Sequence, residues 1–395
     1  MFQNGFNGSS SSFVGDIPLI SVMDVLADGF ISYNSVKGRA SVTDEEAERY
    51  SVVYGDVLFQ RSSENQEDAG TSNVYFDQQK RAVFGGFVIR GRAISPYDPA
   101  CMKYLLLSSP IRRQIVCRAQ GAQHINVSQE VLEGVELVLP SLPEQRLIGA
   151  FFRGLDSLIA LHQRKLDDVK QLKRGMLQKM FPKDGSSVPE VRFPGFTDPW
   201  EQRKLGELYE KNTERNVCGF GPNRTLSVAT MTFNEEGNGA DEASLPSYKV
   251  IRVGDVAFEG HTNKEFAYGR FVVNAQADGI MSPRFSCLRP KHNYPVLFWK
   301  YYLHNERVMR RILVRSTKRG TMMNELVPAD LFSQTIPVPC PDEQHAIGVF
   351  FRDLDDLITL HQREHVVVCG SRRLSGFLLA DIRSAGDNSN QMPIC

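Results

Sequence analysis

The sequence of 395 residues lacks the features that mark membrane and secreted proteins. No apolar run approaches the roughly 20 residues that a membrane-spanning helix needs. The N-terminus has neither the basic region nor the apolar core of a secretory signal. The seven cysteines are scattered without a Cys-x-x-Cys pair, which is typical of reduced thiols rather than of a disulfide framework or a zinc ribbon. We therefore expect a cytoplasmic protein, with flexible ends at residues 1–16 and 384–395.

The sequence also lacks an excess of either charge and the common catalytic motifs. Its 46 basic and 46 acidic residues cancel, which excludes a uniformly basic protein but not a local basic patch. No dinucleotide-binding glycine motif, Walker A motif or serine-nucleophile elbow is present. The Asn/Asp-Pro-Pro-aromatic signature of DNA methyltransferases is absent as well. We expect no catalytic residues in this chain.

One short match to a zinc motif needs weighing. Residues 361–365, with His361, Glu364 and His365, fit the pattern His-x-x-Glu-His. The related stretch at His162 lacks the glutamate and the second histidine. We therefore favour polar residues within a coiled coil over a metal site and expect no bound metal.

The chain is a tandem duplication with a shift of 199 residues. Between residues 144 and 164, 15 of 21 positions are identical to the stretch at 343–363. Residues 144–180 are predicted to form one long helix, because apolar positions recur at alternating spacings of three and four. This heptad seam predicts a helical partner, and the seam positions are Phe152, Leu155, Ile159, His162, Leu166, Val169, Lys173, Met176 and Met180, with Phe351, Leu354, Ile358 and His361 in the second copy. Beyond His361 the heptad pattern of the second copy fails.

A mixed α/β (α+β) pattern precedes each long helix. In the first half we expect a strand at 17–25 and two strands within 50–59 joined by a hairpin-type turn at Gly55-Asp56. A polar loop at 61–73, a strand at 83–89, a helix at 98–116 and a strand at 131–139 follow. Ser141 and Glu144 form a capping signal for the long helix, which Pro182 and Gly185 end. Gly254-Asp255 and Pro339 repeat landmarks of the first half, so the second half follows the same plan.

Basic, amide-rich stretches occupy the same place in both halves, and Arg, Lys and Gln side chains suit phosphates and base edges. A solvated helix face is the competing interpretation. The candidate DNA-binding residues are Arg61, Gln78, Arg81, Arg112, Arg113, Arg118, Gln120, Gln123 and His124 in the first half and Lys264, Arg270, Arg284, Arg310, Arg311, Arg315, Lys318 and Arg319 in the second. A helix of about 37 residues spans ~55 Å, roughly 16 base pairs. Two such helices paired antiparallel would hold two DNA-reading domains a fixed distance apart.

The chain resembles the DNA specificity subunit of type I restriction–modification systems over essentially its whole length. The motifs that carry the resemblance are Pro-Glu-Gln at 143–145 and Pro-Asp-Glu-Gln at 341–344, each followed by Ile-Gly-x-Phe-Phe-Arg-x-Leu-Asp and Leu-His-Gln-Arg. Leu-Gln-Lys-Met-Phe-Pro at 177–182, Val-Arg-Phe-Pro-Gly-Phe at 191–196 and Trp200-Glu201 complete them.

The resemblance implies a non-catalytic subunit that recognises a bipartite DNA target, as a pseudo-twofold duplication. It implies a target-recognition domain at 1–140, a spacer helix at 141–182, a linker at 183–198, a second recognition domain at 199–339, and a distal helix with a divergent tail at 340–395. The implied partners are double-stranded DNA, two modification (methyltransferase) subunits and a restriction/translocase subunit. The implied cofactors bind to those partners, S-adenosylmethionine to the methyltransferase and ATP with Mg to the restriction subunit. Docking would use the helices, at Phe152, Leu155, Ile159, Leu166, Val169, Phe351, Leu354 and Ile358.

Two departures from the family pattern leave alternatives open. The first half lacks the Arg-Phe-Pro-Gly-Phe…Trp-Glu opening of the second, and the sequence from Glu364 onward does not resemble the family. A silent or truncated specificity cassette, or a structural scaffold, is therefore one alternative. A fused restriction–modification enzyme, or a metal hydrolase using His361 and His365, is another.

Overall fold

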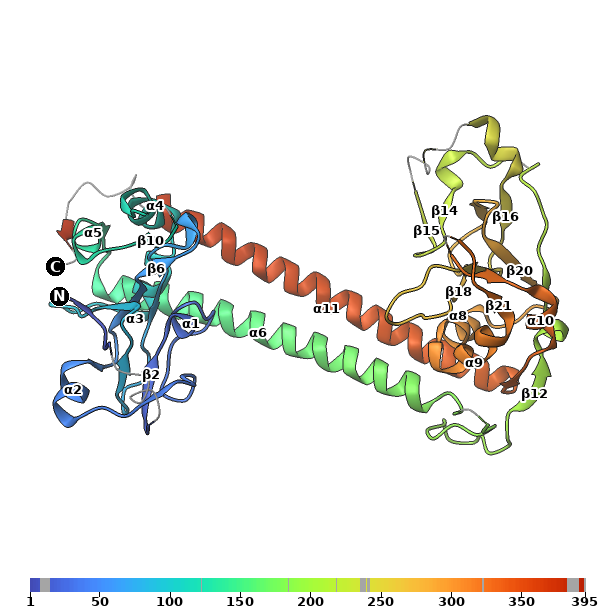
Figure 1. Cartoon of the computed structure of the whole chain (residues 1–395), viewed down its shortest axis with the longest axis horizontal. Coiled ribbons are helices and arrows are strands. Elements are labelled where there is room, and N and C mark those ends of the chain that lie inside the picture. The colour runs from blue at the N-terminus through green and yellow to red at the C-terminus, as the bar shows by residue number, and fades with distance from the viewer. Residues whose placement is uncertain are drawn as a thin grey trace. The chain divides into compact units, whose positions relative to one another are not determined.

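The computed structural model describes residues 1–7, 15–121, 123–183, 185–217, 219–234, 239, 242–321, 323–381 and 391–393. It divides into two compact units, one formed by residues 1–163 with 363–395 and the other by residues 164–362. The division falls within the two long helices, α6 (Leu142–Lys179) and α11 (Pro341–Asp381). Each unit therefore contains one α/β body and an end of each long helix (Figure 1).

Unit 1 is built on two four-stranded sheets. One has the order β1 (Phe2–Asn4), β9 (Val88–Gly91), β5 (Val57–Gln60) and β7 (Ser72–Val74), all antiparallel. The other has the order β3 (Arg39–Ala40), β2 (Ile17–Ile20), β8 (Ala82–Phe84) and β4 (Ser51–Val52), with β2 and β8 parallel. The remaining elements are α1 (Val22–Val25), α2 (Asp44–Arg49), β6 (Ser62–Ser63), η2 (Gln66–Asp68), α3 (Pro99–Leu106), α4 (Ser109–Arg118), β10 (Ile125–Asn126), α5 (Gln129–Glu133) and β11 (Glu136–Val138).

Unit 2 repeats the first of these sheets as β13 (Tyr209–Lys211), β20 (Ser286–Pro290), β17 (Val256–Glu259) and β18 (Arg270–Val273). Its helices α8 (Val296–His304), α9 (Glu306–Ser316) and α10 (Pro328–Ser333) follow in the order of α3, α4 and α5. Its other elements are β12 (Glu201–Lys204), α7 (Leu205–Leu208), η3 (Pro222–Arg224), β14 (Leu226–Ser227), β15 (Thr232–Phe233), η4 (Glu242–Ser247), β16 (Lys249–Ile251), β19 (Gly279–Met281), β21 (Thr317–Lys318), β22 (Glu325–Leu326) and β23 (Thr335–Val338). The predicted α/β duplication is confirmed.

A buried Asp–Arg pair explains the repeated Gly-Asp motif. Asp255, only 1% exposed, accepts hydrogen bonds of 3.0 and 2.8 Å from Nε and Nη2 of Arg289. Asp56 and Arg92 form the same two-bond contact in unit 1, at 2.9 and 2.6 Å. These hydrogen bonds raise the pKa of both arginines. The preceding glycines adopt φ values of +89° and +92°, a conformation that suits glycine.

The predicted hairpin at Gly55-Asp56 is wrong. β4 pairs with β8, whereas β5 pairs with β7 and β9, so the turn carries the chain from one sheet to the other. The strand expected at 83–89 is likewise divided between the two sheets. The strand expected at 131–139 begins instead as helix α5, and the polar loop at 61–73 contains β6, η2 and the start of β7. For the strands, a long-range partner that local sequence does not reveal decides the pairing.

The predicted long helix and its seam are confirmed. α6 begins directly after Ser141, and all nine of its seam positions are buried or half-buried. Within unit 2, Nζ of Lys173 lies 2.5 Å from Oδ1 of Asp355 on α11. Within unit 1, Nδ1 of His162 lies 3.2 Å from Oε2 of Glu364 on α11. Each unit therefore joins the two helices in antiparallel order, and α11 continues as a helix well beyond His361, where the heptad pattern ends.

Two contacts attach the α/β body to the long helices in the same way in both units. Tyr104 donates a hydrogen bond of 2.8 Å to Asp156, and Tyr301 donates one of 2.6 Å to Asp355. Gln145 and Gln344 donate from their amides to the carbonyls of Pro140 and Pro339. These repeated side-chain contacts position each sheet against the helix that follows it.

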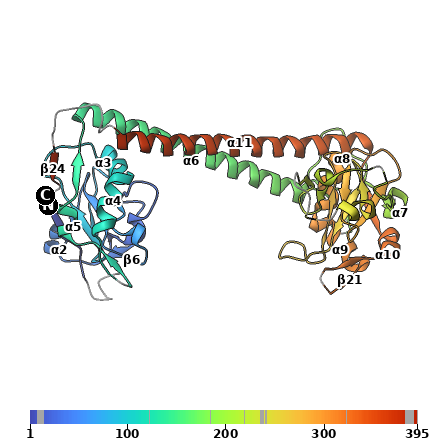
Figure 2. The same cartoon turned by 90° about the horizontal axis from the view of Figure 1, so that it is seen from above.

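The end of the chain completes unit 1. β24 (Gln391–Pro393) pairs antiparallel with β11, with Met392 opposite Leu137 (Figure 2). In unit 2 the equivalent partner of β23 is β12, with Arg203 opposite Ile336. β24 thus takes the place that β12 has in unit 2. The expectation of flexible ends is wrong for 391–393 and for β1, while 8–14, 382–390 and 394–395 lie outside the described residues.

The Val-Arg-Phe-Pro-Gly-Phe…Trp-Glu motif holds the start of α11. Arg192 donates hydrogen bonds of 2.9 and 2.8 Å to the two carboxylate oxygens of Glu343, and Trp200 Nε1 donates to the same carboxylate at 3.1 Å. Glu343 is 1% exposed, so these donors compensate a buried charge. The corresponding Glu144 of unit 1 is exposed, which agrees with the absence of the motif from the first half.

We predict that Asp255→Ala destabilises unit 2 by about 1–3 kcal/mol. The substitution removes the acceptor of the buried Asn212 amide and of the Arg252 backbone N–H, and leaves Arg289 paired with Glu214 alone. Arg81→Ala is the matched control, since Arg81 and Glu48 form an ion pair with side chains 65% and 75% exposed. We expect the control to cost less than about 1 kcal/mol. Denaturant unfolding, followed by hydrogen exchange of β17 and β20, measures the difference. Equal costs for the two substitutions would contradict a structural role of the Asp255–Arg289 pair.

Candidate nucleic-acid interface

Helix α9 presents a row of arginines because its opposite face is apolar. Met309, Ile312 and Leu313 are buried in the core of unit 2. The Asn305 side chain caps the N-terminus by accepting a hydrogen bond from the backbone N–H of Arg307. The intervening positions, Arg310, Arg311 and Arg315, are exposed.

The basic character continues beyond the end of α9. Lys318 in β21 and the following Arg319 are also exposed. None of Arg310, Arg311, Arg315, Lys318 and Arg319 makes an ion pair with a residue in the described part of the chain. We name these five residues the α9 basic strip. Three of them lie on α9, Lys318 lies in β21 and Arg319 follows directly after it.

Arg307 belongs to the same helix but has a structural role. Its Nη1 donates a hydrogen bond of 2.8 Å to the carbonyl of Gln178, and the Asn305 amide donates to the carbonyl of Leu177. These are carbonyls at the C-terminal end of α6, which have no partner within the helix. Arg307 and Asn305 therefore attach α9 to the end of α6 within unit 2.

In unit 1 the corresponding helix α4 divides its two adjacent arginines between structure and surface. Nη2 of Arg112 donates hydrogen bonds of 2.8 Å to the carbonyls of both Glu67 and Ala69, and burial lowers the pKa of this arginine. Arg113 is exposed and has no ion pair among the described residues. Arg112 therefore supports the loop at 66–69, whereas Arg113 is available to a ligand.

The other candidates of unit 1 are dispersed over its surface. Arg118 is exposed at the end of α4 and donates to the carbonyl of Gln114. Gln120 pairs through its backbone with Asn126, which brings the exposed Gln123 and His124 into the tight loop between them. Arg61 donates to the carbonyl of Gly86, Gln78 is exposed, and Arg81 pairs with Glu48.

The other three candidates of unit 2 differ in whether they form an ion pair. Arg270 is held by Glu259 at 2.6 Å and by the carbonyl of Ala229 at 3.1 Å. Lys264 and Arg284 are exposed. Only Lys264 and Arg284 of these three are therefore without an ion pair to a described residue.

The long helices also carry exposed apolar side chains outside the seam, which were not predicted from the sequence. Leu147, Phe151, Leu158 and Leu161 on α6 are between 45% and 73% exposed in unit 1. In unit 2, Leu172, Leu357 and Leu360 are 43–49% exposed. Their sequence signal is an apolar residue outside the seam, which is weak because isolated exposed leucines are common.

Two residues of the zinc-like motif, Glu364 and His365, lie in unit 1 and have neighbours there. Glu364 lies against His162, as described above. Both ring nitrogens of His365 lie 3.8 Å from Sγ of Cys369, one turn later on α11. His365 thus contacts a thiol on its own helix, as expected for side chains four residues apart.

Residues 6–171 match the family model described as the type I restriction modification DNA specificity domain. The chain belongs to the DNA specificity subunits of type I restriction–modification systems. Such a subunit directs DNA recognition and is not itself catalytic.

Relatives extend the similarity over most of the chain. A protein assigned as the type I restriction enzyme MjaX specificity subunit of Methanocaldococcus jannaschii is 23% identical over 384 residues, which cover 92% of this chain and 86% of that protein. The MjaVIII specificity subunit of the same organism is 23% identical over 287 residues, covering 66% of this chain and 65% of the relative. The crystal structure of a type I restriction–modification S subunit from M. genitalium has the same fold, with a TM-score of 0.53 at 12% identity over 96% of this chain and 93% of that one.

As a specificity subunit, the chain works as part of a DNA-binding restriction–modification complex. In the described part of the chain, no helix is both long enough and apolar enough to span a bilayer.

Arg112 and Arg113 of α4 provide a test of the roles described above, in which the first supports a loop and the second is available to a ligand. We predict that Arg112→Ala destabilises unit 1 by about 1–3 kcal/mol, because two loop carbonyls lose a charged donor. Arg113→Ala should leave the unfolding free energy unchanged within about 0.5 kcal/mol and weaken DNA binding. Denaturant unfolding and DNA titration of both variants check this. The division of roles is wrong if Arg113→Ala destabilises the protein as much as Arg112→Ala.

Proposed function

We propose that this specificity subunit reads a bipartite DNA sequence, with one recognition domain for each half-site. The domains are residues 1–140 and 199–339, separated by the spacer helix at 141–182 and the linker at 183–198, and followed by the distal helix and tail at 340–395. The observation that carries the proposal is the repeated plan, in which each unit has the same sheet order and the same Asp–Arg and Tyr–Asp contacts. Two like bodies on one chain suit two half-sites.

The α9 basic strip supports DNA contact by unit 2. Five exposed cations without a described carboxylate partner can neutralise phosphates, and each neutralised phosphate releases counterions. In unit 1 the available groups are Arg113, Arg118, Gln123 and His124, near the end of α4. We propose these groups, together with Lys264 and Arg284 of unit 2, as the principal DNA contacts.

The long helices are proposed to set the unread gap between the half-sites. A helix of 38 residues, such as α6, extends about 57 Å at roughly 1.5 Å per residue. The seam residues are buried or half-buried in the helix pair. We therefore propose that partner subunits dock on the exposed apolar positions of α6 and α11. This revises the docking set predicted from the sequence, which consisted of seam residues.

The proposed partners are two methyltransferase subunits and a restriction/translocase subunit. S-adenosylmethionine would bind to the former, and ATP with Mg to the latter. We propose two pairs of exposed leucines for such docking, since neighbouring exposed apolar side chains can form the contiguous patch that marks a protein contact. They are Leu158 and Leu161 in unit 1 and Leu357 and Leu360 in unit 2.

The spacer role predicts a change of gap without a change of half-sites. We propose to insert four residues after Val169 in α6 and four after Ile358 in α11, which lie about one turn from the Lys173–Asp355 contact. The paired insertion lengthens both helices by about 6 Å, or roughly two base pairs. Methylome sequencing of cells that also supply the methyltransferase subunit should show the original half-sites with a longer gap.

The control is Arg113→Ala, which should weaken recognition and leave the gap unchanged. An altered half-site sequence in the insertion variant, with the gap retained, would contradict the spacer role.

A further inference from the structure

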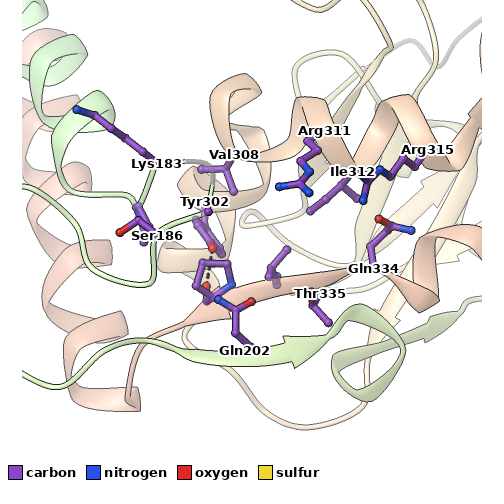
Figure 3. A pocket seen from close by; sticks show the side chains of 14 residues that line it. Lys183, Ser186, Gln202, Tyr302, Val308, Arg311, Ile312, Arg315, Gln334 and Thr335 are labelled. Carbon is purple, nitrogen blue, oxygen red and sulfur yellow. Dashed lines mark hydrogen bonds between the residues drawn. The ribbon is translucent and has the colours of Figure 1, made fainter.

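A polar recess lies between α9 and the β12·β23 ribbon in unit 2. It has a volume of about 320 Å³ and is lined on one side by Arg311 and Arg315. The opposite side carries Gln202, Gln334 and Thr335 (Figure 3). Tyr302, Ile312 and Ile336 form its apolar floor. We call this cavity the arginine recess.

The charge of the arginine recess is unbalanced. Among the described residues that line it there is no carboxylate, and apart from Lys183 its other polar side chains are neutral amides and hydroxyls. Lys183 contributes its stem, but its ammonium points away from the recess and pairs with Glu190 (Figure 3). The two guanidinium groups therefore have no counter-charge among the described residues that surround them.

Because of their spacing on α9, the two positively charged arginines repel each other when no anion is bound between them. Arg311 and Arg315 are four residues apart on α9, so their side chains extend from the same face of the helix over the recess (Figure 3). Like charges at this spacing repel each other and destabilise a helix. An anion between them would turn the repulsion into two attractive contacts. Arginine forks match the oxygens of a phosphate in particular.

Neutral donors suit the same ligand. The Gln334 amide donates to the carbonyl of Asp330, which fixes the side chain at the rim. The Gln202 and Thr335 side chains line the recess beside it, where an amide N–H and a hydroxyl can donate to an oxyanion. The cavity is large enough for a phosphate group and is continuous along α9 with the basic strip.

Unit 1 does not repeat the recess. The buried residues Ile111 and Ile115 of α4 match Met309 and Leu313 of α9, which places Cys117 at the position of Arg315. Leu137 matches Ile336, which places Glu136 at the position of Thr335. One of the two cations is thus missing from unit 1, and a carboxylate lies where unit 2 has a hydroxyl.

We propose that the arginine recess binds one phosphodiester group of the DNA at the half-site read by unit 2. This inference rests on the proposed function, in which unit 2 contacts DNA. It adds that Arg311 and Arg315 act on the same phosphate rather than on two phosphates. Because unit 1 lacks this recess, the two half-sites would also differ in the contacts made to the DNA phosphate backbone.

The test uses the full chain in complex with its methyltransferase subunits and a duplex that carries the target. Arg311→Gln, Arg315→Gln and the double variant are titrated over a range of salt concentrations. Each single variant should weaken binding roughly tenfold for the loss of one charged contact. It should lower the slope of log K against log salt by less than about 0.9, because the remaining arginine still neutralises the phosphate. The double variant should lower the slope by about 0.9, the value for one phosphate, and not by the roughly 1.8 expected if the two arginines neutralise two phosphates. Arg49→Gln, which removes an exposed charge from unit 1, should leave the slope unchanged.

Neutral methylphosphonate linkages, introduced one at a time into the duplex, identify the phosphate. One position should weaken binding of the wild-type complex and have no effect on the double variant. Inorganic phosphate, titrated into the wild-type complex and followed by ³¹P NMR, provides the comparison with a free anion.

The outcomes separate the inference from the proposed function. A complex that binds its target specifically, with a salt slope that is unchanged in the double variant, would overturn the recess assignment alone. Binding of free phosphate by the recess without any change in DNA slope would also overturn it, in favour of a free-anion site. A wild-type complex without sequence-specific DNA binding would instead refute the proposed function.

Discussion

The heptad seam of α6 must be covered by another helix, and the rest of the chain is organised to provide that cover. Each buried apolar seam residue contributes about 1.5–3 kcal/mol as an upper estimate. Phe152 in unit 1 and Leu166 in unit 2 are each only 5% exposed. The duplication supplies the partner, because it places a second copy of the same helix after the second recognition body. Lys173 and His162 interrupt the apolar seam, and each finds a carboxylate on α11.

The same duplication explains how the recognition bodies are held. The Asp–Arg pair fixes the strands of each central sheet, and the Tyr–Asp hydrogen bond ties the following helix to the seam. These contacts are internal to the scaffold, and the surface of α9 or α4 is free to differ. Arg315 against Cys117 and Thr335 against Glu136 show how far the surfaces have diverged. A conserved scaffold with divergent surfaces suits two domains that read different sequences.

Much of this architecture could be predicted from the sequence, since the seam and the 199-residue repeat are periodic signals. The pairing of the strands could not. The turn at Gly55-Asp56 has the local chemistry of a hairpin, but the partner of β4 is β8, about thirty residues away. β24 has only three residues and no strand signal of its own, and its pairing depends on the vacant edge of β11. Local patterns do not encode such distant partners.

The candidate site was predicted in outline and not in detail. Sequence alone treats Arg112 and Arg113 alike, yet a rotation of one residue along α4 directs the first to loop carbonyls and the second to the surface. Gln202 and Gln334 carry no recognisable signal, because only the fold brings β12 and β23 against α9.

The most direct test of the account is methylome sequencing after the segment 199–339 is replaced by that of another specificity subunit. We predict a target in which one half-site changes while the other half-site and the gap remain. A change in both half-sites, or a single uninterrupted recognition sequence, would contradict two independent readers on one helical spacer.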